Sequence, residues 1–280
     1  MERTDDTKSL LLRAYSIRED IVRMLAEAKS GHPGGSLGMS DIFTALYFSV
    51  MRHEPRNPAW PERDRLVLSN GHICPVLYAC LAEAGYFPKS ELAGLRKAGS
   101  KLQGHPHRGA VPGIENSSGP LGQGISQAVG MAIVGKREKQ PWRVFALMGD
   151  GELNEGQAWE AFMLASKYKL DNLVGIIDRN KIQIDGTTED VLPLEPLADK
   201  CRAFGWDVAV IDGNDMGAVL AALRAEPAKG RPRMIIANTL PGKGVSFMEG
   251  KYEWHGKAPN KEQAEAALKE LEEARRRLSS

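Results

Sequence analysis

Residues 142–152 read WRVFALMGDGE, and residues 172–180 read NLVGIIDRN. Each stretch opens with a short apolar run that is typical of a buried strand and closes with polar residues. We therefore predict strands over 142–148 and 172–177. Each of these strands would carry polar groups at its carboxyl end, and the pair defines the centre of the fold.

The residues between the two strands have the spacing of a helix. Ala158, Phe162 and Ala165 recur on one face of 155–168, with Gly156 near its start. A strand, a helix and a second strand in this order form a right-handed crossover in which the two strands run parallel. Their carboxyl ends then meet at one edge of the sheet, which is where open α/β sheets bind ligands.

Asp150 and Asn180 follow the two strands and would bring oxygen ligands to that edge. Mg²⁺ prefers hard oxygen donors and keeps positions open for the phosphate oxygens of a substrate. The pair therefore predicts a site for a divalent cation that carries a diphosphate. Taken alone, Gly149-Asp150-Gly151 has a second interpretation, a turn after a strand, with Asn180 as a loop residue.

Further glycine-rich loops, most of them with a histidine, are spread along the chain. They read SGHPGGSLG at 30–38, SNGH at 69–72, GHP at 104–106, SGPLGQG at 118–124 and WHG at 254–256. The first is predicted to be a compact loop between two amphipathic helices, and RLVL at 65–68 predicts a strand before the second. In the fourth, glycine backbone opens the predicted helix 125–137, where an anion or a flat ring could approach closely.

Four of the six histidines lie in these loops: His32, His72, His105 and His255. Because each sits in a loop with flanking glycine and not in the core, its side chain suits proton transfer and recognition of sugar hydroxyls near neutral pH. Each of the four could instead only brace the backbone of its loop. The other two, His53 and His107, match no motif and are predicted to have no role in the site.

In their order and spacing these motifs resemble those of transketolase, in particular its diphosphate-binding amino-terminal domain, over most of residues 7–260. The Gly-Asp-Gly around Asp150 with a downstream Asn180 resembles the thiamine diphosphate signature, which holds the metal and the diphosphate. The resemblance implies thiamine diphosphate as the cofactor and Mg²⁺ or Ca²⁺ as the metal. Asp150, Asn180 and Ile182 are the implied metal residues.

The resemblance also implies roles for the other candidate residues. His32, His105 and His255 would orient the hydroxyls of the donor sugar and move protons. The implied cofactor-binding residues are His72, Gly119, Leu121, Gly149, Asp150, Gly151, Glu155, Asn180 and Ile182.

Two charged residues lie beside the metal motif. Glu155 corresponds to a carboxylate that relatives place at the subunit interface, in a network that links two active sites. From the residues alone it is an acid at a helix start, where the helix dipole favours it. Arg179 stands where many relatives have an acidic residue or Asn. It leaves Asn180 in place and is expected to alter the charge beside the diphosphate.

The composition is that of an ordinary globular enzyme. The 280 residues are enough for one large domain, 42% of them are hydrophobic, and a net charge of +1 indicates neither a nucleic acid nor a membrane partner. Because no secretory amino terminus is recognised, we expect a cytoplasmic protein. The three cysteines, Cys74, Cys80 and Cys201, are expected to be buried free thiols.

The alternation of strands and helices continues toward the carboxyl end. Strands are predicted at 206–211 and 233–238, and helices at 194–204 and 216–225. We therefore predict an α/β fold with an open, mostly parallel sheet flanked by helices, the diphosphate-binding domain of the thiamine diphosphate-binding fold. This domain would span residues 1–260. Residues 261–280 would add an amphipathic helix packed on the domain or on a partner.

The resemblance covers the first domain of a transketolase, and the family's pyrimidine-binding and carboxyl-terminal domains have no counterpart in the chain. We therefore expect the amino-terminal subunit of a split transketolase, which works with a separate carboxyl-terminal subunit in an α2β2 heterotetramer. The implied reaction transfers a two-carbon ketol unit from a ketose phosphate to an aldose phosphate. Two alternatives stay open, the α-subunit of a 2-oxo acid dehydrogenase-type thiamine enzyme and a noncatalytic cofactor-binding homologue.

Overall fold

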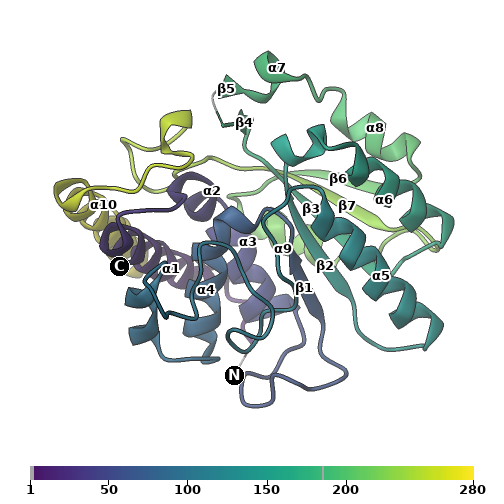
Figure 1. The fold of residues 1–280 in the computed structure, drawn as a ribbon, viewed down its shortest axis with the longest axis horizontal. Coiled ribbons are helices and arrows are strands. Elements are labelled where there is room, and N and C mark those ends of the chain that lie inside the picture. Colours follow the sequence, from purple (N-terminus) through teal and green to yellow (C-terminus); the bar gives the residue numbers. More distant parts are fainter. Residues whose placement is uncertain (1–2, 185) are drawn as a thin grey trace.

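A computed structural model describes residues 3–184 and 186–280 of the chain. At its centre lies a five-stranded parallel sheet with the strand order β1-β2-β3-β7-β6 (Figure 1). The strands are β1 (Arg65–Leu68), β2 (Val144–Gly149), β3 (Leu173–Arg179), β6 (Asp207–Asp212) and β7 (Arg233–Asn238). The predicted α/β class, with a parallel sheet between helices, is confirmed.

The central strand β3 is buried over its whole length. Its side chains alternate between two cores: Val174 and Ile176 join one, and Leu173 and Ile177 join the other. A parallel sheet is covered by helices on both faces, which explains the unbroken apolar run in the sequence. Since β2 and β3 pair in parallel along their lengths, their carboxyl ends lie at the same edge, as predicted.

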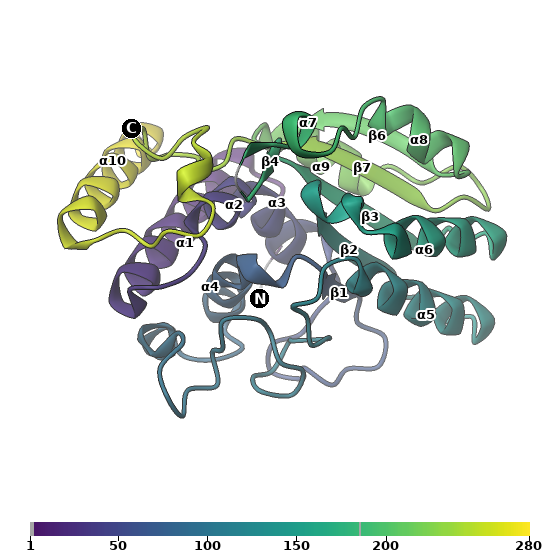
Figure 2. The ribbon, with the colours of Figure 1, turned by 45° about the horizontal axis from the view of Figure 1, so that its top comes forward.

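Three helices cover one face of the sheet. They are α5 (Gln123–Arg137), α6 (Gly156–Lys167) and α8 (Leu197–Ala203), which Figure 2 shows side by side. In the core beneath them, the rings of Phe162 and Trp206 have centroids 5.2 Å apart. The indole N–H of Trp206 donates to the Phe162 carbonyl at 3.1 Å, so this buried side chain has its polar group satisfied.

A larger group of helices covers the other face. They are α1 (Thr7–Ala28), α3 (Ser40–Ala45), α4 (Cys74–Ala84) and α9 (Met216–Arg224). In α1, Leu10, Ala14, Ile17 and Ile21 are fully buried and recur at helical spacing. Burial of one such leucine or isoleucine stabilises the fold by about 1.5–3 kcal/mol.

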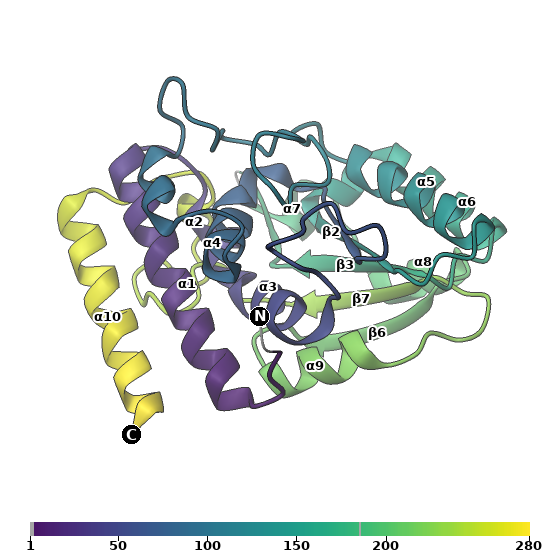
Figure 3. The same ribbon diagram turned by 90° about the horizontal axis from the view of Figure 1, so that it is seen from below.

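The last helix, α10 (Lys261–Ser279), lies along α1 (Figure 3). It starts with a capping box at Asn260, which satisfies two backbone N–H groups of the first turn. Leu271 is fully buried in the same core as α1, and Arg275 pairs with Glu19 of α1 at 2.8 Å. The carboxyl-terminal helix therefore packs on the domain itself.

The predicted loop at 30–38 is wrong in part, because α2 (Pro33–Gly38) is a short helix. Pro33 lies in its first turn, where a missing N–H loses no helical hydrogen bond. Gly34 lets α2 approach another backbone closely: an added Cβ would lie 3.1 Å from the carbonyl oxygen of Trp254. This contact holds α2 against the loop that contains His255.

After β3 the chain forms a small antiparallel pair, β4 (Ile182–Gln183) and β5 (Gly186–Thr187), followed by α7 (Thr188–Val191). None of these three elements was predicted. The remaining elements are short helices. One is a π-helix, η1 (Leu46–Val50), and four are 3-10 helices, η2 (Gly71–Ile73), η3 (Lys89–Gly94), η4 (Gly151–Asn154) and η5 (Tyr252–Trp254). Across the described residues, no helix combines the length and the apolar character needed to cross a membrane.

Candidate functional site

A cavity of about 370 Å³ lies at the carboxyl edge of the sheet, beside the ends of β2 and β3. Its lining contains every residue predicted for the site: His32, His72, His105, Gly119, Leu121, Gly149, Asp150, Gly151, Glu155, Asn180, Ile182 and His255. Loops that are far apart in the sequence therefore meet around one cavity. The roles that the resemblance implies for these residues stay predictions.

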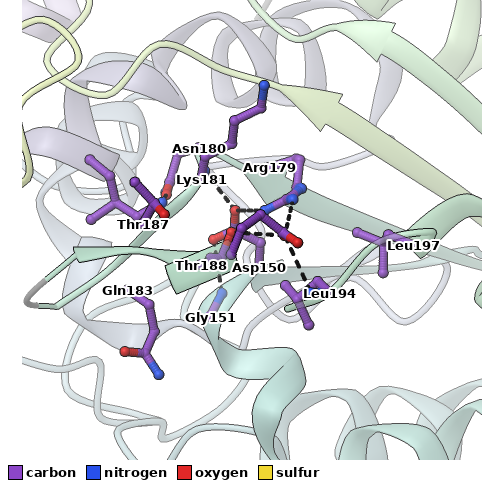
Figure 4. A network of polar contacts seen from close by, with 12 residues as sticks. Asp150, Gly151, Arg179, Asn180, Lys181, Gln183, Thr187, Thr188, Leu194 and Leu197 are labelled. Carbon is purple, nitrogen blue, oxygen red and sulfur yellow. Dashed lines mark hydrogen bonds and ion pairs between the residues drawn. The ribbon is translucent and has the colours of Figure 1, made fainter. Parts of the chain in front are cut away.

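Asp150 follows β2 and begins the turn η4. Its buried carboxylate accepts three N–H groups: Oδ1 accepts from Gly151 N at 2.8 Å, and Oδ2 accepts from Lys181 N at 2.7 Å and Arg179 Nη1 at 2.9 Å (Figure 4). Burial raises the pKa of Asp150, while these bonds and the Arg179 charge oppose the rise. The carboxylate is thus fixed in one orientation.

The side chain of Asn180 also has a defined orientation. Its Nδ2 donates to Asp178 Oδ2 at 2.9 Å, and its Oδ1 accepts from Ile182 N at 2.9 Å. Both bonds are lost if the amide turns round, so Oδ1 is fixed with a second lone pair left over. Asp178 is buried and also accepts from the Thr239 hydroxyl. Burial of the Asp178 carboxyl raises its pKa to about 7.

Arg179, the last residue of β3, is in direct contact with Asp150, which the sequence did not indicate. Besides Asp150, the buried guanidinium donates to Thr188 Oγ1 at 2.6 Å, Glu189 Oε1 at 2.8 Å and Glu195 Oε1 at 3.0 Å. The Arg179 guanidinium therefore forms ion pairs with three carboxylates, those of Asp150, Glu189 and Glu195. Arg179 lines a neighbouring cavity, together with Asn180.

Three of the loop histidines form a cluster. The ring centroids of His32 and His72 lie 5.1 Å apart, those of His32 and His255 5.5 Å, and those of His72 and His255 5.1 Å. Burial, with the neighbouring histidines, lowers the pKa of His32 to about 4 and the pKa of His72 well below its ordinary value. Both imidazoles are therefore neutral at pH 7, and each offers one donor and one acceptor nitrogen.

His105 is an exposed residue of the same lining. An added Cβ on Gly119 would lie 3.8 Å from its ring, so the imidazole sits beside the glycine loop 118–124. Partial burial and the nearby charge of Arg96 lower the pKa of His105. It adds another neutral imidazole to the cavity, on a more exposed side chain.

The low pKa of His32 predicts a pH dependence of stability. Unfolding returns the imidazole to its ordinary pKa of 6.5, so the unfolded chain binds a proton that folded His32 takes up only near pH 4. The free energy of unfolding should therefore fall as the pH drops from 6.5 toward 4. Urea melts across this range should show a smaller fall for His32→Gln than for the wild type, because other titrating groups cancel in the comparison. Equal falls would contradict the low pKa.

Glu152 is a buried carboxylate that the sequence prediction did not select. It accepts from the Ser69 hydroxyl, from Gly122 N at 2.6 Å and from Gly149 N at 3.1 Å. Burial raises the pKa of Glu152, and these bonds oppose the rise. The side chain ties the end of β1, the glycine loop before α5 and the end of β2 to one another.

The backbone at the start of α5 is engaged inside the protein. Gly122 N donates to Glu152, and Gly124 N donates to Ser69 Oγ at 3.0 Å. These two N–H groups therefore already have acceptors inside the protein, and close approach of an anion or a flat ring to this loop stays a prediction. Gly122 has a φ of +78°, and an added Cβ would lie 2.8 Å from Cβ of Glu155, so a close fit explains this glycine.

Three buried polar atoms of the cavity lining have no hydrogen-bond partner among the described residues. They are Oδ1 and Nδ2 of Asn70 and Nδ1 of His32. A buried polar group without a partner costs about 1–3 kcal/mol. A polar ligand would relieve this cost, and the Asn70 amide can donate to a phosphate oxygen. The residues present therefore fit a diphosphate.

Sequence reasoning missed part of the lining: Asn70, Glu152, Asn154, Gln183 and Ile184. Asn70 and Glu152 belong to the quoted motifs SNGH and GDGE, so their place in a motif was an available signal. The other three lie in segments without a motif. Only the turn after Asp150 and the small hairpin after β3 bring them to the cavity.

Comparison with known proteins shows similarity to transketolases along almost the whole chain. The family model described as transketolase, thiamine diphosphate binding domain, matches residues 12–272. The 6-deoxy-6-sulfo-D-fructose transketolase subunit of a Clostridium species is 46% identical over 93% of this chain and 95% of its own length. An apulose-4-phosphate transketolase subunit of Actinobacillus succinogenes is 44% identical, with the same two coverages.

Solved structures of longer transketolases resemble the chain over part of their length. Transketolase from Campylobacter jejuni superposes with a TM-score of 0.88 at 33% identity, over 96% of this chain and 45% of that one. The chain thus spans under half of this structure and nearly all of the subunit relatives. It belongs to the transketolase family, as a thiamine diphosphate-binding amino-terminal domain.

Proposed function

We propose that this chain is the amino-terminal subunit of a thiamine diphosphate-dependent transketolase, which is active together with a separate carboxyl-terminal subunit. The observation that carries the proposal is the cavity at the carboxyl edge of β2 and β3, where Asp150 and Asn180 meet four loop histidines. The high coverage of relatives that are named as transketolase subunits supports a division into two chains.

A metal ion would link the diphosphate to the protein. Asp150 Oδ1 and Asn180 Oδ1 each keep a free lone pair, and Ile182 lies in the same lining. In the described part of the chain, no group of three or more His, Cys, Asp or Glu side chains could hold a metal by itself. Diphosphate oxygens would supply further ligands, an arrangement typical of Mg²⁺, with Ca²⁺ as the alternative.

Bound thiamine diphosphate supplies the carbon centre that takes up the ketol unit and stabilises its negative charge. The residues of this chain would handle the hydroxyl groups and protons of the sugar. His32 and His105 have lowered pKa values, so each is neutral near pH 7 and offers an acceptor nitrogen to the proton of a donor hydroxyl. His255 would orient the donor beside them, and His72 would lie beside the diphosphate.

The proposed substrates are a ketose phosphate as donor and an aldose phosphate as acceptor. Two relatives are named for a sulfo-sugar and for a sugar phosphate, so both names contain an anionic sugar. Most groups that bind this anion are proposed to lie on the partner subunit. An α2β2 assembly and a cytoplasmic location belong to the same proposal.

The two alternatives are less well supported. Membership of the transketolase family favours ketol transfer over the 2-oxo acid dehydrogenase type. The cavity contains both Asp150 and Asn180, together with neutral histidines. This set of residues favours a catalytic subunit over a noncatalytic homologue.

Reconstitution tests the proposal. Two-carbon transfer is assayed with thiamine diphosphate and Mg²⁺ for the purified chain, for the partner subunit, and for their mixture. Only the mixture should be active, because this chain offers the diphosphate half of the site. Activity of the chain alone would contradict the two-subunit proposal, and an inactive mixture across ketose donors would contradict the transketolase function.

A further inference from the structure

Arg179 contacts Asp150, a proposed metal ligand. Its side chain is 3% exposed, and one guanidinium nitrogen, Nη1, donates both to Asp150 Oδ2 at 2.9 Å and to Thr188 Oγ1 at 2.6 Å. The other, Nη2, donates to Glu189 and Glu195. Since it has four acceptors and is buried, the guanidinium has little freedom to move away from Asp150.

The contacts of Asp150 leave one position open on its carboxylate. A carboxylate has about four lone-pair sites, two on each oxygen. On Oδ2 both are used, by Arg179 Nη1 and by Lys181 N. On Oδ1 one is used, by Gly151 N. A cation can therefore bind through Oδ1 alone, and a bidentate contact through both oxygens is blocked.

We propose that Arg179 is a positioning residue that selects Mg²⁺ over Ca²⁺ by holding Asp150 in a one-oxygen contact. The inference rests on the proposed cofactor site. Mg²⁺ needs near-octahedral geometry with short bonds and accepts single carboxylate oxygens, so a fixed Oδ1 suits it. Ca²⁺ takes more ligands, often with a bidentate carboxylate, and tolerates irregular geometry. Fixing Asp150 therefore favours the smaller ion.

The test compares the two ions in the wild type and in Arg179→Met. The dissociation constants of Mg²⁺ and Ca²⁺ are measured separately by calorimetry, on the complex of the two subunits at saturating thiamine diphosphate. In Arg179→Met the Mg²⁺ constant should rise about 10–100-fold, the usual loss when a residue that orients a metal ligand is removed. The Ca²⁺ constant should change far less, because Oδ2 becomes free for a second contact.

The ratio of the Mg²⁺ and Ca²⁺ dissociation constants separates the effect of the Asp150 orientation from effects of charge and of folding. Loss of a positive charge would strengthen binding of both divalent ions by the same factor, and a general loss of structure would weaken both alike. An unchanged ratio therefore overturns the proposal. Arg202→Met is the matched control, since Arg202 forms an exposed pair with Asp199 on nearby α8. It should leave both constants unchanged.

A second variant covers the case in which Arg179→Met fails to fold. Arg179→Lys keeps the charge, but an ammonium group cannot bond the same four acceptors at once. In Arg179→Lys the dissociation constant of Mg²⁺ should again rise more than that of Ca²⁺. An unchanged ratio of the two constants would again overturn the proposal. Failure of the wild-type complex to bind thiamine diphosphate with either ion would instead contradict the proposed function.

Discussion

Asp150→Asn should weaken the binding of thiamine diphosphate and Mg²⁺ by about a hundredfold or more, since loss of even an outer partner of a metal ligand costs 10–100-fold. The substitution keeps the size of the side chain and removes its negative charge. The metal then loses its only carboxylate among the proposed protein ligands, and Arg179 loses the ion pair at 2.9 Å.

Cofactor and metal titrations of the reconstituted variant measure this effect, with a thermal melt to show that the chain stays folded. Asp199→Asn is the control, because it removes the charge of an exposed carboxylate, whereas the carboxylate of Asp150 is buried. Unchanged cofactor affinity in Asp150→Asn would show that Asp150 is only a turn residue after β2.

His105→Ala should lower kcat/KM for the ketose donor by about a hundredfold or more, the range for loss of a positioned acid–base group. The side chain is an exposed part of the cavity lining, while Asp150 and Asn180 carry the proposed diphosphate anchor. Loss of the imidazole should therefore affect the donor and the transition state, and leave cofactor affinity near normal.

Steady-state kinetics measure kcat/KM for the donor, and a cofactor titration measures the affinity for thiamine diphosphate. Together they show which of the two His105→Ala changes. His107→Ala is the matched control, two residues along the same loop and exposed, and outside the cavity lining. It should behave as the wild type. If cofactor affinity collapses in His105→Ala while donor kinetics at saturating cofactor stay normal, His105 belongs to the cofactor site.

The sheet was predictable because its signal is local. β2 and β3 are apolar runs, a helical pattern separates them, and parallel pairing follows from that order. The small elements were not. α2 is a six-residue helix of the sequence PGGSLG, which has no helical period, and the strands β4 and β5 have two residues each. Their conformations depend on contacts with distant segments, such as that of Gly34 with Trp254.

The motif residues of the site were predictable, and the contacts that orient them were not. Glu152 reaches Ser69 across 83 positions of sequence, and Asp150 reaches Arg179 across 29. Such pairs have no spacing rule, because they depend on which strands are neighbours in the sheet. Arg179 was noticed as a departure in charge, and only the structure places its guanidinium on Oδ2 of Asp150.

We propose that this chain supplies the diphosphate half of a site that a second subunit completes. The most direct measurement follows two-carbon transfer while the partner subunit is titrated into a fixed amount of the chain, with thiamine diphosphate and Mg²⁺ in excess. Activity should rise from zero and reach a plateau at a fixed ratio of the two chains, and Asp150→Asn should abolish it at limiting cofactor. Full turnover by this chain before any partner is added, or transfer that needs no thiamine diphosphate, would contradict this division of the site between two subunits.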